Sequence, residues 1–244
     1  MRSIVTGGAG FVGSHLVERL IGRGHEVLCI ERPGARRGWI EGRPVTWDES
    51  GLGDVDRLTH LFRDADNVFH LAALTEARSP EDFYLVNTEG TSHVMEAAAS
   101  VARPPRVVFM STLAAAGPCR GDQDLTADTV PYPLSVYGHS KLLAEAVVHA
   151  YADRVPATIL RFPSVYGPRE RAVLKLFRMI ARGFAITVGG WERELSLVYV
   201  DDAVSGLVAA AESEQAIGRT YLIAHPESVT WAEFARAVGK EVGQ

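Results

Sequence analysis

The sequence predicts an α/β fold with a doubly wound parallel sheet, and three observations support this class. Short apolar runs alternate with segments of helical periodicity along most of the chain. The runs are apolar at nearly every position, which is typical of strands that helices cover on both faces. A glycine-rich turn follows the first run, at a place where open sheets of this class bind ligands.

The predicted strands recur at intervals that suit βαβ units with right-handed crossovers. They occupy residues 3–6, 26–30, 44–47, 67–71, 106–111 and 157–161. The first crossover helix has the clearest periodicity. Val12, Leu16 and Leu20 form an apolar stripe, and Gly22 and Gly24 end it.

After about residue 163 the elements become shorter. We expect a helix over 171–182, a strand over 195–200, a helix over 202–213, a strand over 220–223 and a final helix over 231–242. Thr230 and Glu233 have the spacing of a capping box at the start of this last helix. No internal repeat or low-complexity tract interrupts the order.

Composition excludes several classes of protein. The 244 residues carry a formal net charge of −5, which argues against nucleic acid as a general partner because phosphate binding needs excess Lys and Arg. Cys29 and Cys119 give no disulfide framework, and no metal-ligand spacing is visible. The longest apolar stretch is too short to cross a membrane. Met1 leads directly into a strand without a signal peptide, so we expect a cytoplasmic protein.

The turn after the first predicted strand reads VTGGAGFVG and ends at Gly13. Gly7 would permit a tight turn, Gly10 a close approach of the backbone to a pyrophosphate, and Gly13 close packing of helix on strand. The N–H groups of Phe11 and Val12 fall in the first helical turn, where the helix dipole favours anions. We therefore predict that this turn binds the pyrophosphate of a dinucleotide.

The end of the second predicted strand should select the adenosine ribose, and its residues leave two cofactors open. Glu31 can accept hydrogen bonds from the ribose 2′- and 3′-hydroxyls, which favours NAD. Arg32, with the arginines that follow it, can pair with a 2′-phosphate, which favours NADP. NAD is slightly favoured, because a carboxylate beside a 2′-phosphate costs Coulomb energy. Asp48 is the candidate for the adenine amino group, and Asp54 is its rival.

Tyr137 and Lys141 are four residues apart and would project from the same face of a helix. A nearby ammonium stabilises a phenolate, which otherwise forms only near pH about 10. That phenolate can take the proton of a secondary alcohol while a hydride leaves, and the phenol can return it in the reverse direction. Ser111 and Thr112 end the fifth predicted strand. Thr112 is the better candidate for a hydroxyl that orients the substrate oxygen, because it falls 25 residues before Tyr137, whereas Ser111 also fits a strand-end cap.

The fourth predicted strand ends in the segment His70-Leu71-Ala72-Ala73. We expect His70 to be a packed strand-end histidine rather than a catalytic one. Ala72 and Ala73 have small side chains, which would leave room for the adenosine and phosphate portion of a cofactor.

Together these motifs resemble the extended short-chain dehydrogenase/reductase family, which is the NAD-dependent epimerase/dehydratase group. The resemblance is carried by TGGAGFVG at 6–13, HLAA at 70–73, ST at 111–112, YGHSK at 137–141 and RFPSVYGP at 161–168. VDD at 200–202 is also similar to the family's late strand–helix junction. The resemblance covers essentially the whole chain.

The resemblance implies a Rossmann-type domain over residues 1–162 and a small, interleaved and shortened substrate-binding region over 163–244. It implies Thr112, Tyr137 and Lys141 as the catalytic set, with Lys141 also bonding the nicotinamide ribose. Further cofactor contacts are implied for Leu71, Asn87, Ser111, Phe162 and Pro163.

The resemblance also implies partners. A small-molecule substrate would contact Thr112, Ser164 and Arg169, although Arg169 equally fits a solvated loop. Family members usually form homodimers through a four-helix bundle, here built from the helices that begin near Asp82 and Tyr137. They usually continue beyond the last helix of this chain, so the resemblance leaves the competence of the substrate pocket open.

Two branches of the family remain possible. Nucleotide-sugar enzymes usually carry asparagine at the position of Ser164 and often arginine at that of Leu195. The stretches ERPG at 31–34 and STLAAAGP at 111–118 are similar to 3β-hydroxysteroid dehydrogenases and dihydroflavonol-type reductases. The leading prediction is hydride transfer at a secondary alcohol or ketone, with or without epimerisation. The second class is a non-catalytic dinucleotide sensor, whose expected loss of the tyrosine or lysine is not seen.

Overall fold

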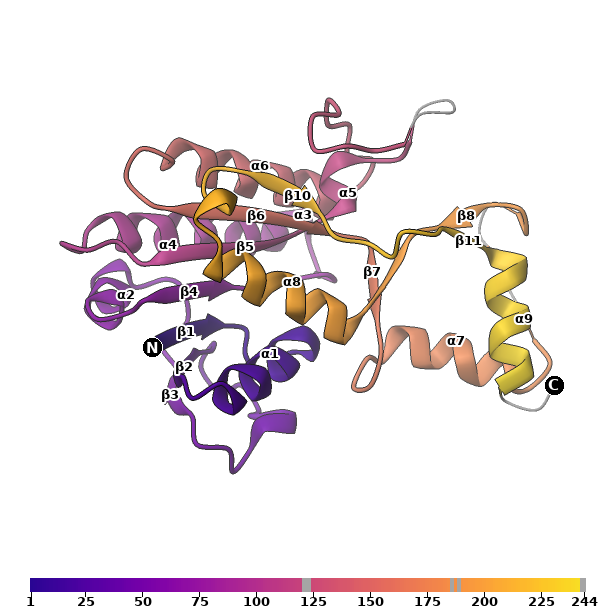
Figure 1. The fold of residues 1–244 in the computed structure, drawn as a ribbon, viewed down its shortest axis with the longest axis horizontal. Helices are drawn as coiled ribbons and strands as arrows, with labels where there is room; N and C mark the ends of the chain where they lie inside the picture. The colour runs from indigo at the N-terminus through magenta and orange to yellow at the C-terminus, as the bar shows by residue number, and fades with distance from the viewer. Residues whose placement is uncertain (120–123, 185–186, 188–189, 242–244) are drawn as a thin grey trace.

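The computed structural model describes residues 1–119, 124–184, 187 and 190–241, and a seven-stranded sheet forms its centre (Figure 1). The strand order is β10-β6-β5-β4-β1-β2-β3, and every neighbouring pair is parallel. The strands are β1 (Arg2–Thr6), β2 (Glu26–Ile30), β3 (Thr46–Asp48), β4 (Asn67–His70), β5 (Arg106–Thr112), β6 (Ala157–Phe162) and β10 (Thr220–Leu222). The order reverses beside β1, so the ligand crevice of a doubly wound sheet lies at the carboxyl ends of β1 and β4.

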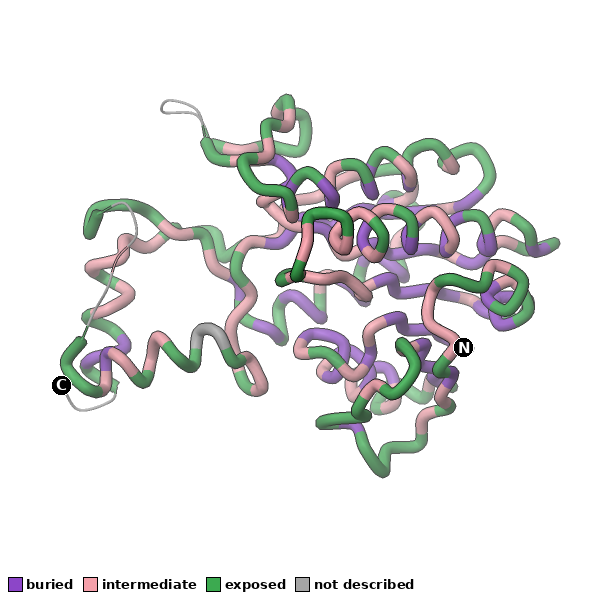
Figure 2. The backbone as a smooth tube through the Cα atoms, turned by 180° about the vertical axis from the view of Figure 1, so that it is seen from behind, coloured by how far each residue is buried: buried purple, intermediate pink, exposed green. Residues whose placement is uncertain are grey.

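Helices cover both faces of the sheet, as strands that are apolar throughout require. α1 (Phe11–Gly22) and α8 (Val200–Glu212) pack on one face. The opposite face is covered by α2 (Val55–Phe62), α4 (Gly90–Ala99) and α6 (Val136–Ala150). Figure 2 shows buried residues along the strands and on the inward sides of these helices, so each layer encloses its own apolar core.

Several short elements connect these layers. Ser79 caps α3 (Pro80–Phe83), which continues through the π-helical turn η2 (Tyr84–Glu89) into α4. α5 (Leu113–Ala116) follows β5 directly. The described residues also form the short 3₁₀ helices η1 (Gly38–Ile40) and η3 (Glu214–Ala216).

A smaller region projects from one end of the sheet (Figure 1). It contains α7 (Ala172–Ile180) and α9 (Trp231–Glu241), together with two small sheets. In one of them β7 (Ser164–Tyr166) and β9 (Leu197–Tyr199) are parallel, and in the other β8 (Glu194–Leu195) and β11 (Val229–Thr230) are antiparallel. α8 and β10 lie between these segments in the sequence but pack in the main body, so the two regions are interleaved.

Most predicted elements are confirmed to within two residues at each end. The third strand begins at Thr46, because Pro44 has no N–H to donate to a neighbouring strand. The strand predicted over 195–200 is divided, since β8 pairs with β11 whereas β9 pairs with β7. The last helix is described to Glu241, and its predicted final residue, Val242, lies outside the described residues.

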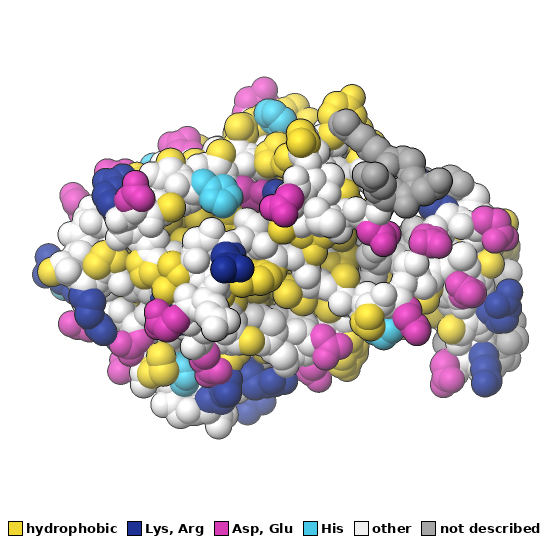
Figure 3. Space-filling view, turned by 45° about the horizontal axis from the view of Figure 1, so that its top comes forward, with side chains coloured by type: hydrophobic (Ala, Val, Ile, Leu, Met, Phe, Trp, Pro, Cys, Tyr) yellow, Lys and Arg dark blue, Asp and Glu magenta, His cyan; other side chains and the backbone are white. Residues whose placement is uncertain are grey.

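The capping box at the start of α9 is confirmed. The Thr230 hydroxyl oxygen accepts the N–H of Glu233 at 3.1 Å, and the Glu233 carboxylate accepts the N–H of Thr230 at 2.8 Å. None of the helices in the described part of the chain combines the length and apolar character that a membrane crossing requires. Figure 3 shows basic and acidic side chains intermixed over the face that it presents.

Candidate active site

Two cavities open at the carboxyl ends of the strands. One of about 600 Å³ is bordered by the residues that follow β1, β2 and β4. The other, of about 740 Å³, is bordered by the end of β5, the residues after β6 and the smaller region. Residues of the predicted dinucleotide site border the first cavity, and Thr112 of the predicted catalytic set borders the second.

The glycine turn forms the floor of the first cavity. Gly7 has φ +74°, and a Cβ there would lie 2.9 Å from the backbone N of Ala72. A Cβ on Gly13 would collide with the carbonyl oxygen of Gly7, so helix α1 can approach the turn only with glycine at this position. The N–H groups of Phe11 and Val12 lie in the first turn of α1, where a helix has no intrahelical acceptor for them. These positions agree with a pyrophosphate cradle.

Glu31 and Arg32 line the same cavity at the end of β2. One carboxylate oxygen of Glu31 accepts the N–H of Ala9 at 2.7 Å, which links the end of β2 to the glycine turn. Burial raises the pKa of Glu31 above its usual range, although the Ala9 N–H and Arg32 oppose this.

Asp48 is not brought to the cavity. It accepts hydrogen bonds from Ser50 and is paired with Arg57 at 2.6 Å. Asp54 caps α2 by accepting the N–H of Arg57 at 2.9 Å. Residues 51–53, which follow β3, form this part of the cavity wall instead. They are two glycines and a leucine, which carry no polar side chain that would have predicted adenine binding.

The opposite wall of the cavity is the segment Leu71–Leu74. Asn87, which the resemblance implied as a cofactor contact, holds this segment from behind. Its amide oxygen accepts the N–H of Leu74 at 2.7 Å, and its amide nitrogen donates to the Leu74 carbonyl at 3.0 Å. Glu89 and His93 also border the cavity, and sequence reasoning missed both.

Tyr137 lies in the first turn of α6, which Ser135 caps by accepting the N–H of Gly138 at 3.0 Å. The hydroxyl of Thr112, at the end of β5, accepts the N–H of Ala114 at 3.1 Å and also influences the Tyr137 phenol. Burial raises the pKa of Tyr137 above its ordinary value, and the Thr112 hydroxyl opposes that shift.

Lys141 lies one turn further along α6 and is 2% exposed. Its ammonium donates to the carbonyl oxygen of Met110 at 2.9 Å and stands 4.0 Å from the centre of the Phe109 ring. Burial lowers its pKa to about 7, against the attraction of Glu145.

Ser111 faces away from both cavities. Its hydroxyl donates to Glu145, which forms a buried ion pair with Arg161 at 2.7 Å. Glu145 on α6 is thereby joined to Ser111 at the end of β5 and to Arg161 at the end of β6. The sequence spacing of these three residues does not predict the cluster. The Phe162 side chain is likewise buried in the core.

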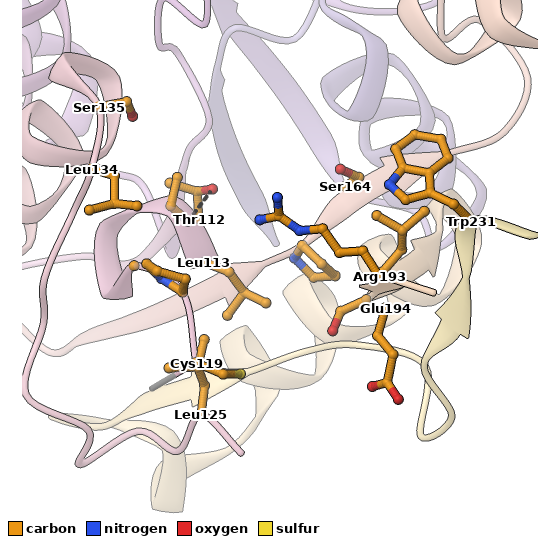
Figure 4. Close-up of a pocket in the computed structure, with 16 residues that line it drawn as sticks. Thr112, Leu113, Cys119, Leu125, Leu134, Ser135, Ser164, Arg193, Glu194 and Trp231 are labelled. Atoms are coloured by element: carbon orange, nitrogen blue, oxygen red, sulfur yellow. Dashed lines mark hydrogen bonds between the residues drawn. The ribbon is translucent and has the colours of Figure 1, made fainter. Parts of the chain in front are cut away.

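The second cavity is the open cleft in Figure 4. Thr112, Pro163 and Ser164 border it on the side of the main sheet, whereas Arg193 and Trp231 border it on the side of the smaller region. The guanidinium of Arg193 points into the space between the two sides (Figure 4). The sequence analysis did not single out Arg193, which is two residues from the position where nucleotide-sugar enzymes often carry arginine.

Arg169 does not reach the cleft. Its guanidinium donates to the Ser14 hydroxyl at 3.1 Å and pairs with Glu18 at 2.7 Å, which fixes the loop after β7 onto α1. Its backbone φ of +77° is unusual for a residue other than glycine.

A parallel sheet with a glycine turn after β1, and a tyrosine and a lysine one turn apart beside a strand-end hydroxyl, define the short-chain dehydrogenase/reductase class. The family model for the NAD dependent epimerase/dehydratase family matches residues 3–224. The chain belongs to this family, and it is an enzyme of the extended type.

Individual relatives agree with this assignment. A Bacillus subtilis protein named as an uncharacterized UDP-glucose epimerase, YtcB, is 30% identical over 93% of this chain and 78% of its own length. A ceramide reductase from Caulobacter vibrioides is 31% identical over 98% of this chain and 70% of its own. The crystal structure of UDP-glucuronic acid 4-epimerase from Bacillus cereus in complex with NAD superposes with a TM-score of 0.87, at 28% identity over 100% of this chain and 83% of that one.

Proposed function

We propose that this enzyme binds NAD and reversibly oxidises a secondary alcohol of a nucleotide sugar. Thr112, Tyr137 and Lys141 form the catalytic set in this proposal. The single observation that carries it is the placement of Tyr137 and buried Lys141 one turn apart on α6, with the Lys141 ammonium bonded to the Met110 carbonyl of β5, the strand that ends at Thr112. This is the arrangement that a tyrosine acid–base needs.

The residues around the first cavity fit a dinucleotide. Side chains at Gly7 and Gly13 would fill the turn, and the first turn of α1 offers N–H groups to a pyrophosphate. Glu31 would accept from a ribose hydroxyl with the carboxylate that also accepts the Ala9 N–H. Because this partly buried carboxylate would repel a 2′-phosphate, we propose NAD rather than NADP.

Bound NAD would supply a hydride acceptor at its nicotinamide ring. Tyr137, as phenolate, takes the proton from the alcohol oxygen of the substrate, and the carbon–oxygen double bond forms as hydride leaves the carbinol carbon. The Thr112 hydroxyl stabilises this phenolate. Lys141 contributes positive charge from its anchor on the Met110 carbonyl. In the reverse direction the Tyr137 phenol returns the proton to the alkoxide.

A nucleotide sugar fits the groups around the cleft. The hydroxyls of Ser135 and Ser164 can bond sugar hydroxyls, and Arg193 offers a guanidinium to a diphosphate. Trp231 gives a flat ring against which a base can stack. The crystallised Bacillus cereus epimerase, whose solved complexes contain UDP-glucuronic acid and NAD, supports this substrate class. The relatives do not favour a steroid-type reductase or a non-catalytic sensor.

The test is to incubate the purified enzyme with NAD and UDP-glucuronic acid, UDP-glucose or UDP-N-acetylglucosamine. Products are separated by ion-exchange chromatography and identified by NMR, while absorbance follows reduced nicotinamide. A new sugar isomer without accumulated NADH establishes epimerisation, and accumulated NADH establishes net oxidation. Reduction of a long-chain keto lipid, with no turnover of any nucleotide sugar, would refute the proposed substrate class.

We also propose a homodimer through the bent helix of residues 80–99 and through α6. Leu85 on η2 and Val136 and Leu143 on α6 are large apolar side chains that are 57%, 39% and 38% exposed. Four such helices, two from each subunit, would cover these side chains.

A further inference from the structure

His70 is enclosed at the end of β4, behind the wall of the proposed cofactor cavity. It is 1% exposed, and both of its ring nitrogens contact threonine hydroxyls. Nδ1 lies 2.7 Å from Oγ1 of Thr6, the residue before the glycine turn. Nε2 lies 3.0 Å from Oγ1 of Thr91 in α4. None of these three side chains borders the cavity, so a direct cofactor contact does not explain them.

The donors and acceptors fix the direction of this chain of hydrogen bonds. Thr91 donates its hydroxyl proton to the Asn87 carbonyl at 2.6 Å, so its oxygen must accept from Nε2 of His70. Thr6 accepts the N–H of Ala72 at 3.1 Å, and among the described residues Nδ1 of His70 is the acceptor within reach of its own hydroxyl proton. His70 is therefore neutral and carries its proton on Nε2. Burial, together with the charge of Lys141, lowers the pKa of His70 to about 3, in agreement with a neutral ring.

The hydrogen bonds at both ends of this series hold the same short segment of backbone, residues 72–74. At one end Thr6 fixes the N–H of Ala72, and at the other Asn87 fixes the N–H and carbonyl of Leu74. This segment is the cavity wall that faces Gly7. The Leu71 N–H also donates to the Thr6 carbonyl at 3.2 Å, and the bonds through His70 add a side-chain link from this end of β1 to α4 and Asn87.

The same network reaches the catalytic helix. The Asn87 amide also donates to the Ser140 hydroxyl at 3.0 Å, and Ser140 lies in α6 between Tyr137 and Lys141. A displacement of the wall would thus change where a bound dinucleotide lies relative to these two side chains.

We propose that His70 is a positioning residue for the dinucleotide, which joins Thr6 to Thr91 and so holds the 71–74 wall at a fixed separation from the glycine turn. This inference rests on the proposed NAD site and adds to it a residue that does not touch the cofactor. Its function follows from the direction of the hydrogen bonds, because only the neutral Nε2–H form of the ring satisfies both threonines.

The experiment measures the NAD dissociation constant by calorimetry for Thr6→Val and Thr91→Val, which remove one hydroxyl each. We expect the dissociation constant to increase on the order of tenfold in each, and kcat at saturating NAD to fall as well, because the dinucleotide lies differently relative to Tyr137. Thr158→Val is the matched control, since Thr158 is also fully buried and donates to the Ala216 carbonyl at 2.8 Å. It should lose stability but leave the NAD dissociation constant unchanged, and Thr6→Ser and Thr91→Ser should restore binding.

The outcomes separate this inference from the proposed function. If the unmodified enzyme does not bind NAD, both are overturned. If it binds NAD and folded Thr6→Val and Thr91→Val bind equally well, only the inference is overturned. Nitrogen NMR of the histidine-labelled unmodified enzyme gives a second measurement that needs no variant. It should show His70 as the Nε2–H tautomer at neutral pH, and the Nδ1–H tautomer or a protonated ring would overturn the inference.

Discussion

The Thr112 hydroxyl at the end of β5 favours the phenolate form of Tyr137, which lies in the first turn of α6. Burial favours the protonated phenol and is the larger effect, whereas the Thr112 hydroxyl opposes it. The acid–base strength of Tyr137 thus depends on a residue that lies 25 positions earlier in the sequence.

Tyr137→Phe should abolish acid–base catalysis while leaving the cofactor site intact. We expect kcat to fall by about 10²- to 10⁴-fold, because the alcohol proton loses its acceptor. The NAD dissociation constant should change by no more than about twofold. Tyr151→Phe is the matched control, since Tyr151 lies at the other end of α6 and should give normal turnover. Full activity in Tyr137→Phe would contradict the assignment of the base.

Thr112→Val should raise the pKa that limits oxidation of the alcohol. The variant loses the hydroxyl that favours the phenolate, so the charged form becomes less stable and needs a higher pH to form. The rising limb of kcat/KM against pH should therefore move to higher pH, and the rate at neutral pH should fall. Thr112→Ser keeps the hydroxyl and should retain the original profile. An unchanged profile in Thr112→Val would show that the hydroxyl does not control the ionisation.

Lys141→Met should change the pH dependence of stability. The pKa of Lys141 is lowered from an ordinary 10.5 to about 7 in the folded chain, so the unfolded chain binds more protons between these values. Burial of the ammonium therefore destabilises the fold in full below pH about 7, and this cost disappears as the pH rises toward about 10. The variant should exceed the unmodified enzyme in free energy of unfolding by about 2–5 kcal/mol at pH about 6, and by much less at pH about 9.5. Urea denaturation at both pH values measures this, and a constant difference would be inconsistent with a buried ammonium.

Glu31→Ala should weaken NAD more than NADP. Removing the carboxylate deletes a ribose acceptor and also removes the charge that would repel a 2′-phosphate. We expect the NAD dissociation constant to rise about tenfold, with a smaller change for NADP. Glu31→Gln keeps an acceptor for the Ala9 N–H and so isolates the charge from the local fold. Equal losses for both cofactors in Glu31→Ala would remove the reason for preferring NAD.

Leu143→Asp should dissociate the proposed dimer, because a carboxylate would be buried among apolar side chains of the four-helix bundle. Sedimentation velocity should show a monomer for this variant and a dimer for the unmodified enzyme. Leu174→Asp in α7 is the control, since Leu174 is similarly exposed, 40% against 38%, but lies outside the bundle. A monomeric unmodified enzyme, or a dimeric Leu143→Asp, would exclude this interface.

The sequence by itself determined the features that local periodicity controls. Apolar runs gave the strands, the glycine spacing gave the turn between β1 and α1, and the four-residue interval gave the shared face of Tyr137 and Lys141. The sequence also indicated that Thr112 would lie at the carboxyl-terminal side of the sheet, where parallel strands all end.

Only the tertiary structure decided which partner each polar side chain takes. Asp48 meets Arg57 and Arg169 meets Glu18, so neither reaches the cavity for which it was predicted. Arg193, by contrast, borders the cleft. The physical reason is that a charged group pairs with whichever opposite charge the fold brings within reach, and residues distant in the sequence set that choice. His70, predicted as a packed histidine, is packed, but only the positions of its two threonines reveal the direction of its hydrogen bonds.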